Sequence, residues 1–194
     1  MKFAKLVVAS AALLAGIAAQ AQVVGSIGGD TGSFLTLSSA GLSGGSVATL
    51  SGTFQVLANS DSTDTKPTGT VGDYLSAEAH ETTVLTFGTG VGYLSFLWGT
   101  PDTYNQLTIT DTLGHTFSFT AGGLGLTTSG TGSEYVQFVD TGALIKSLTY
   151  SNNPGVNSFE TANYSVTAVP EPETYALMLG GLGLVGFMAR RRRG

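Results

Sequence analysis

Residues 91–120 read VGYLSFLWGTPDTYNQLTITDTLGHTFSFT and give the strongest indication of the fold class. The run 91–98 is apolar almost throughout, as expected for a strand that is buried on both faces. Residues 106–110 and 115–120 then alternate polar and apolar side chains on either side of Asp111-Thr112-Leu113-Gly114, which is the pattern of a β-hairpin. The stretch therefore predicts neighbouring antiparallel strands.

The surrounding sequence has the same character. Further strands are expected at residues 34–37, 47–57 (a strand pair or one bulged strand), 83–87, 135–139, 144–151 and 157–166. Glycine-rich residues 22–32 and polar residues 59–74 are expected to be loops. Many short strands separated by Gly and Asn or Asp turns predict an all-β fold. We expect a single antiparallel β-sandwich domain, jelly-roll-like, over residues 22–168, with a barrel as the alternative.

The first 21 residues have the layout of a secretory signal peptide. Lys2 and Lys5 form a basic start, residues 6–19 are apolar, and Ala19 and Ala21 fit the small-residue cleavage rule. We expect the Sec translocon and signal peptidase to handle this segment and to leave a chain that starts at Gln22. The alternative is an uncleaved N-terminal membrane helix.

The last 26 residues have a different layout, in three parts. A short rigid motif comes first, then an uncharged apolar run at 174–189, then a basic cluster. The motif residues are Val169, Pro170, Glu171, Pro172 and Glu173, and the basic residues are Arg190, Arg191, Arg192 and Arg193. Residues 175–189 would form a helix of about 22 Å, which is short for a bilayer core of about 30 Å. The arginines would hold their end in the cytoplasm. The predicted arrangement is a transmembrane helix with an arginine stop, and the alternative is a plain C-terminal anchor.

Residues 169–193 closely resemble the PEP-CTERM sorting signal. The resemblance implies recognition by an exosortase, a membrane-embedded protease of Gram-negative bacteria. It implies a cut near Pro170-Glu171-Pro172 after a transient stay in the inner membrane. It also implies transfer of the body to the cell surface or the extracellular exopolysaccharide matrix.

The body between the two ends is acidic. Lys66 and Lys146 stand against eleven carboxylic acids, so the net charge of residues 22–169 is about −9. Phosphate contacts need Lys or Arg, which argues against a nucleic-acid partner. The charge is compatible with neutral glycans and with cations such as Ca²⁺. The chain has no cysteine, so neither disulfides nor thiolate metal sites can stabilise it.

Residues 98–105, WGTPDTYN, are the first candidate site. They resemble a WGS-x-D-x-YN signature of a subgroup of exosortase-dependent surface proteins, with Thr100 in place of Ser. As a glycan site, aromatic faces would stack on a sugar while polar side chains bind its hydroxyls. The residues concerned are Trp98, Asp102, Tyr104 and Asn105. The alternative is a core tryptophan followed by an Asp-stabilised turn.

Cation binding is the second possibility. Glu160 and Asn163 could join a Ca²⁺ site with backbone carbonyls, or they could be polar residues of an edge strand. Asp61 and Asp64 space two carboxylates for a hard cation, with a plain solvated loop as the alternative. We expect no other cofactor.

Enzymatic activity is not expected. His80 and His115 are the only histidines, and no sequence context selects a nucleophile or a metal-binding pair. The sequence favours a structural or adhesive role in the exopolysaccharide layer, such as that of a biofilm. A carbohydrate-binding module, with or without Ca²⁺, is the alternative, followed by a secreted hydrolase.

Overall fold

The computed structural model describes residues 22–29, 32–152, 155, 157–167 and 182. The predicted signal peptide and, apart from residue 182, the predicted sorting segment lie outside the described residues. No helix in the described part is long and apolar enough to cross a membrane. The transmembrane helix at 174–189 therefore stays a prediction.

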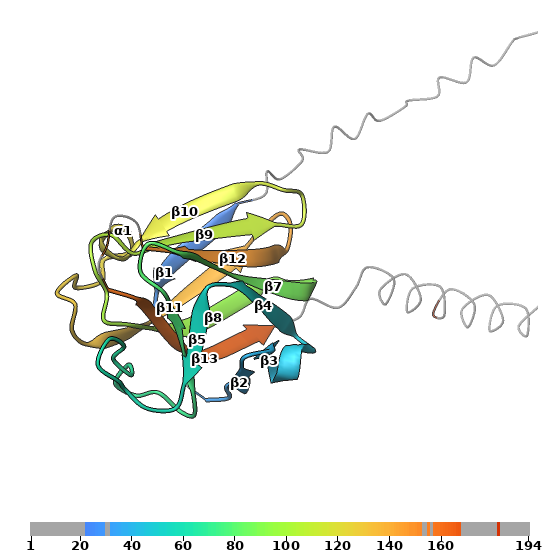
Figure 1. Ribbon diagram of the computed structural model, residues 1–194. Coiled ribbons are helices and arrows are strands. Elements are labelled where there is room, and N and C mark those ends of the chain that lie inside the picture. The colour runs from blue at the N-terminus through green and yellow to red at the C-terminus, as the bar shows by residue number, and fades with distance from the viewer. Residues whose placement is uncertain (1–21, 30–31, 153–154, 156, 168–181, 183–194) are drawn as a thin grey trace, which may run out of the picture.

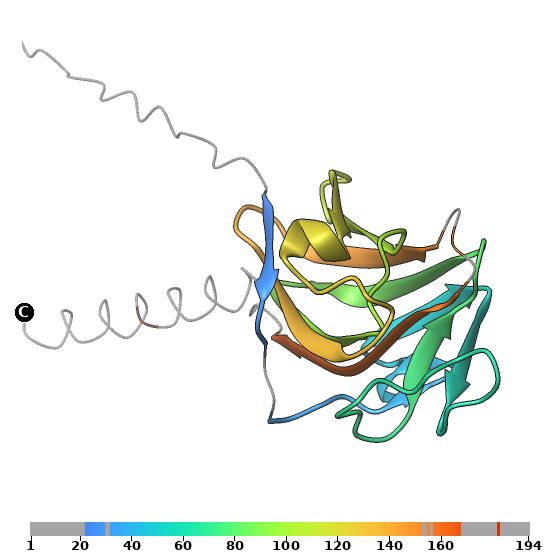
Figure 2. The same ribbon diagram turned by 90° about the vertical axis from the view of Figure 1, so that its left-hand side faces the viewer.

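Two antiparallel sheets make up the described chain (Figures 1 and 2). The first sheet has the order β1 (Val23–Ile27), β11 (Ser133–Asp140), β8 (Tyr93–Gly99), β13 (Phe159–Thr167), β6 (Tyr74–Ala77) and β5 (Phe54–Leu57). The second sheet has the order β10 (Thr116–Thr120), β9 (Gln106–Asp111), β12 (Ile145–Ser151), β7 (Thr82–Val91), β4 (Ala48–Gly52), β3 (Gly41–Leu42) and β2 (Leu37–Ser38). Two short helical turns, η1 (Ser43–Gly45) and α1 (Ala121–Leu124), complete the elements. In Figure 2, β1 (blue) lies at one edge of the molecule and the teal strands lie at the other.

Successive strands from β6 to β13 mostly belong to alternate sheets. The chain changes sheet at every connection except the β9–β10 hairpin, and the resulting orders are β6-β13-β8-β11 and β7-β12-β9-β10. This matches the strand order of a jelly roll. The all-β prediction is confirmed. The barrel alternative is wrong because the described strands form two separate sheets.

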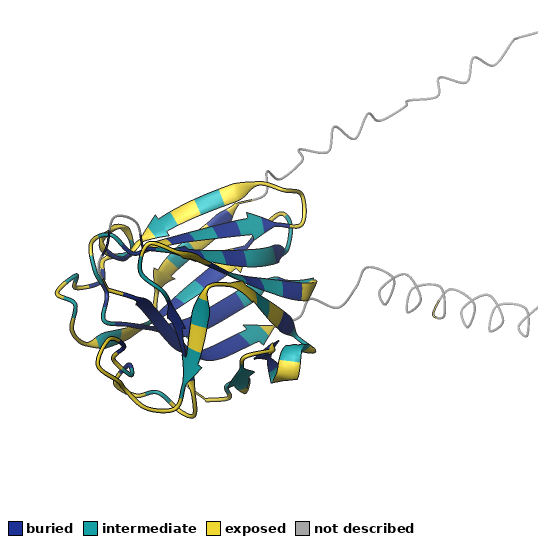
Figure 3. Ribbon diagram, viewed as in Figure 1, coloured by how far each residue is buried: buried dark blue, intermediate teal, exposed yellow. Residues whose placement is uncertain are grey.

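The core lies between the inner faces of the two sheets (Figure 3). Strand β8 is buried on both faces, as predicted. Leu94, Phe96 and Trp98 belong to the main core, whereas Leu97 packs with Tyr74 on the outer face of the first sheet. Strand β8 is buried on both faces because it lies between β11 and β13 in its sheet and other segments cover its inner and outer faces.

Several expected segments are placed differently. Residues 22–32, expected to be a loop, contain strand β1, and residues 47–57 form two strands in different sheets. Strand β1 has a weak sequence pattern because Gly25 must stay small. A Cβ atom at Gly25 would lie 2.8 Å from Cε1 of Phe138. The expected strand at 34–37 contributes only Leu37, whereas the long polar loop is confirmed up to Asp73.

Both ends of the described body lie at one end of the first sheet. Val23 pairs with Asp140, and Thr167 and Val139 both pair with Tyr93. We call this the terminal end. The opposite end, where Gly99 pairs with Ser133, is called the distal end. Strand β11 separates the two by about 24 Å, at about 3.4 Å per residue. In Figure 1, β13 ends on the right and α1 lies on the left.

Candidate functional site

Trp98, the centre of the predicted glycan platform, is part of the core. Its side chain has no exposed surface, and its ring stacks on Phe159 with the ring centroids 4.4 Å apart. A sugar outside the protein cannot reach this ring. The core alternative therefore applies to Trp98, because β8 lies in the middle of its sheet and directs the side chain inward.

The three polar residues of the same segment build the loop that follows β8 at the distal end. The amide of Asp102 donates to Oδ1 of Asn105 over 2.7 Å, and the hydroxyl of Tyr104 donates to Oδ2 of Asp102 over 2.6 Å. Asn105 is fully buried and donates from Nδ2 to Oδ1 of Asn152 over 2.9 Å. Burial, together with the bond to Asp102, raises the pKa of Tyr104. The loop is therefore held by its own side chains and by Asn152.

A hollow of about 200 Å³ lies beside this loop. We call it the distal hollow, and its lining residues are Pro101, Thr127, Thr131, Gly132, Ser133 and Glu134. Ser133 and Glu134 were not among the sequence candidates. They start β11 some thirty residues after the loop that contains Pro101, so only the pairing of β8 with β11 brings these segments together.

The polar loop at 59–73 folds over the outer face of the first sheet. Asp64, which is 1% exposed, accepts a hydrogen bond at Oδ1 from the hydroxyl of Ser76. Gly99 makes room for the loop, because a Cβ atom there would lie 2.4 Å from Cγ of Pro67. Asp61, by contrast, accepts amide hydrogen bonds from Thr63 and Asp64 at 2.8 Å each. These contacts explain both carboxylates as parts of a folded loop.

Glu160 lies under this loop and is 3% exposed. It accepts a hydrogen bond from the hydroxyl of Thr100. Burial raises its pKa to about 7; the nearby Asp64 acts in the same direction, and the hydrogen bond from Thr100 opposes it. The folded protein therefore holds a proton on Glu160 more tightly than the unfolded chain does.

We expect Glu160→Gln to remove a pH dependence of stability. The folded-state pKa of about 7 lies above the ordinary 4.5, so this contribution is fully present below pH 4.5 and is lost as pH rises through 7. The loss approaches about 3 kcal/mol in the free energy of unfolding. Urea unfolding from pH 4 to 8 measures it. The control is Glu81→Gln, which changes an exposed carboxylate. Equal pH slopes for Glu160→Gln and the wild type would contradict the assignment.

Asn163 fastens several segments to β13. Its backbone is left-handed, with φ 54°, next to the irregularity in the pairing of β13 with β8. Its Oδ1 accepts from the amide of Val71 over 2.7 Å, and its Nδ2 donates to the carbonyl of Gly69 and to the hydroxyl of Tyr135. Asn163 thus holds the 59–73 loop, which also places Asp64 and the backbone of Thr65 near Glu160. Within the described part of the chain, no group of three or more His, Cys, Asp or Glu residues could hold a metal ion.

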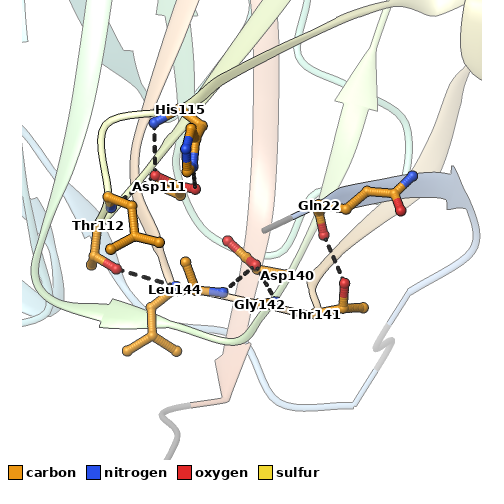
Figure 4. A network of polar contacts seen from close by, with 10 residues as sticks. Gln22, Asp111, Thr112, His115, Asp140, Thr141, Gly142 and Leu144 are labelled. Atoms are coloured by element: carbon orange, nitrogen blue, oxygen red, sulfur yellow. Dashed lines mark hydrogen bonds and ion pairs between the residues drawn. The ribbon is translucent and has the colours of Figure 1, made fainter. Parts of the chain in front are cut away.

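Two aspartate-centred turns organise the terminal end (Figure 4). Oδ1 of Asp111 accepts from the amides of Leu113 and His115, and Oδ2 lies 2.8 Å from Nδ1 of His115. Although burial opposes it, hydrogen bonding, mainly from His115, lowers the pKa of Asp111. Oδ1 of Asp140 likewise accepts amide hydrogen bonds from Gly142 and Ala143.

The same network holds the start of the body. The amide of Thr141 donates to the carbonyl of Gln22 over 3.1 Å, and the amide of Thr112 donates to the carbonyl of Leu144 over 2.8 Å. The Asp111–His115 pair therefore closes the predicted hairpin turn. The turn that follows Asp140 holds Gln22, which is the first residue after the predicted signal cleavage site.

Comparison with known proteins identifies the C-terminal segment. Residues 168–193 match the PEP-CTERM protein-sorting motif, which confirms the resemblance of the tail. No curated protein sequence matches the chain. A solved structure named "Peptidoglycan O-acetylesterase in action, 5 min" is 19% identical, with a TM-score of 0.35. The alignment covers 62% of this chain and 29% of that one, and a likeness this low carries no argument about activity.

Proposed function

We propose that this chain, which carries a PEP-CTERM protein-sorting motif at residues 168–193, is exported and then processed by an exosortase on its way to the cell surface. The motif match is the observation that carries the proposal. The predicted signal peptide would direct the chain through the Sec translocon. The predicted apolar run and its arginines would then hold the chain in the inner membrane until it is cut.

The body has a structural or adhesive role in the extracellular exopolysaccharide layer, and we propose that it is not an enzyme. Its net charge of about −9 favours solubility outside the cell and disfavours binding to polyanions. The Asp111–His115 pair resembles half of a catalytic acid–base pair, but its hydrogen bonds are those of a hairpin turn. Binding of carbohydrate is the second candidate, and the hydroxyl-lined distal hollow favours it.

Intact mass of the extracellular protein, purified from its host, tests the processing. We expect a species that begins at Gln22 and ends between residues 170 and 174, because the signal and the tail would both be removed. Excess mass on that species would reveal an attached glycan or lipid. An extracellular species that still contains residues 190–194 would contradict exosortase processing and leave the tail as an anchor only.

A further inference from the structure

We infer that the distal hollow binds a neutral sugar unit of a polysaccharide. This inference rests on the proposed function, because it supposes that the protein meets exopolysaccharide outside the cell. It concerns a different part of the chain from the sorting motif, so each can fail without the other.

The lining has the chemistry that sugar hydroxyls require. Thr127 and Thr131 have hydroxyls that both donate and accept, and the carboxylate of Glu134 accepts. Ser133 borders the hollow, but its Oγ is buried and is not presented to a ligand. Pro101 adds an apolar wall for the carbon face of a sugar ring.

The walls of the hollow are held in place without a ligand. The amide of Thr100 donates to the carbonyl of Gly132 over 2.9 Å, and the amide of Gly130 donates to the carbonyl of Pro101 over 3.1 Å. Binding would therefore require little ordering of the protein. A volume of about 200 Å³ is below the range of about 300–1,000 Å³ typical of pockets for drug-sized ligands, so it suits one sugar unit.

Charge selects a neutral sugar over an anionic one. Nζ of Lys66 donates to the carbonyl of Ala58 over 2.7 Å, and Nζ of Lys146 donates to the carbonyl of Phe87 over 2.6 Å. These are the two lysines of residues 22–169, and that segment has no arginine. A uronate or sulfated sugar beside Glu134 would therefore meet a like charge without a compensating cation.

The position of the hollow suits a protein that is tethered through its tail. The described body ends with Thr167 at the terminal end, whereas Ser133 lies at the distal end. The sorting motif starts directly after Thr167, at residue 168. A ligand site at the distal end therefore faces away from the attachment point of the motif.

Affinity electrophoresis tests the inference, with the full chain in a mild neutral detergent. Native gels contain dextran, galactomannan or soluble starch as neutral probes, and alginate as the anionic probe. We expect at least one neutral probe to retard the wild type and alginate to leave its mobility unchanged. Glu134→Gln should weaken the retardation constant by about tenfold. Glu81→Gln, which makes the same chemical change at an exposed position elsewhere, should not weaken it.

Each outcome supports or overturns the inference. Failure of every neutral probe, stronger retardation by alginate, or equal losses in the Glu134→Gln and Glu81→Gln variants would overturn it. Thermal unfolding of each variant shows whether a loss reflects unfolding. If Glu134→Gln unfolds, a competition experiment on the wild type takes its place, with free glucose, mannose or galactose added to the gel. Failure of all three sugars to release the protein from the polysaccharide would also overturn the inference. Because purified protein is used, a negative result leaves the sorting proposal intact.

Discussion

Replacing Pro170 and Pro172 together by alanine is expected to trap the protein in the inner membrane and to abolish its release. Proline fixes φ and lacks an amide donor, so we expect the motif to be extended and unable to join a sheet or helix. Alanine restores the amide and favours a helix that continues into the apolar run. The processing enzyme would then lose the extended backbone it must bind. Immunoblots of inner-membrane, surface and medium fractions measure the effect.

Two further variants make this experiment specific. Pro154→Ala makes the same chemical change outside the motif and should be released normally. Replacement of Arg190, Arg191, Arg192 and Arg193 by serine should impair retention in the inner membrane before processing, which gives a different distribution among the fractions. Normal release of the double proline variant would sink the exosortase assignment.

Trp98→Ala is expected to lower the free energy of unfolding by about 3–5 kcal/mol. The side chain has no exposed surface and stacks against both Phe159 and Phe96, so its removal leaves a large cavity between the sheets. Guanidinium denaturation followed by circular dichroism measures the change. Leu113→Ala is the control, because Leu113 is 66% exposed and its loss should cost less than about 0.5 kcal/mol.

The conservative variant Trp98→Phe separates packing from polarity. Nε1 of Trp98 is buried without a hydrogen-bond partner among the described residues, so phenylalanine removes an unfavourable group while it keeps an aromatic ring. We expect a smaller loss of stability than in Trp98→Ala. If Trp98→Ala were as stable as the wild type, the ring would not be part of the core.

Elements with local signals were predicted well. The β9–β10 hairpin was found because its turn and both strands are contiguous, and Asp111 accepts hydrogen bonds from the turn itself. Strand β8 was found because a run that is apolar almost throughout is typical of a strand that is buried on both faces. Strand β1 was missed because its pairing partner, β11, lies more than a hundred residues later, and Gly25 removes the side chain that would have marked the pattern.

The candidate site shows the same limit. The types of residue in WGTPDTYN suited both a sugar platform and a core residue with a turn, and the position of β8 within its sheet places Trp98 in the core. Glu160 and Asn163 could not be assigned from spacing either. Their partners, Thr100, Gly69 and Val71, lie 60 to 94 residues away along the chain.

By itself, the sequence determined the all-β fold class, the acidic charge of the body and the sorting motif. Each of these depends on composition or on contiguous residues, which interact with solvent, membrane or enzyme directly. The tertiary structure decided which side chains are buried, which loop covers the outer face of the first sheet, and that Ser133 and Glu134 border a hollow with Pro101. These features depend on the tertiary structure because strands from distant parts of the chain must pair before their side chains become neighbours.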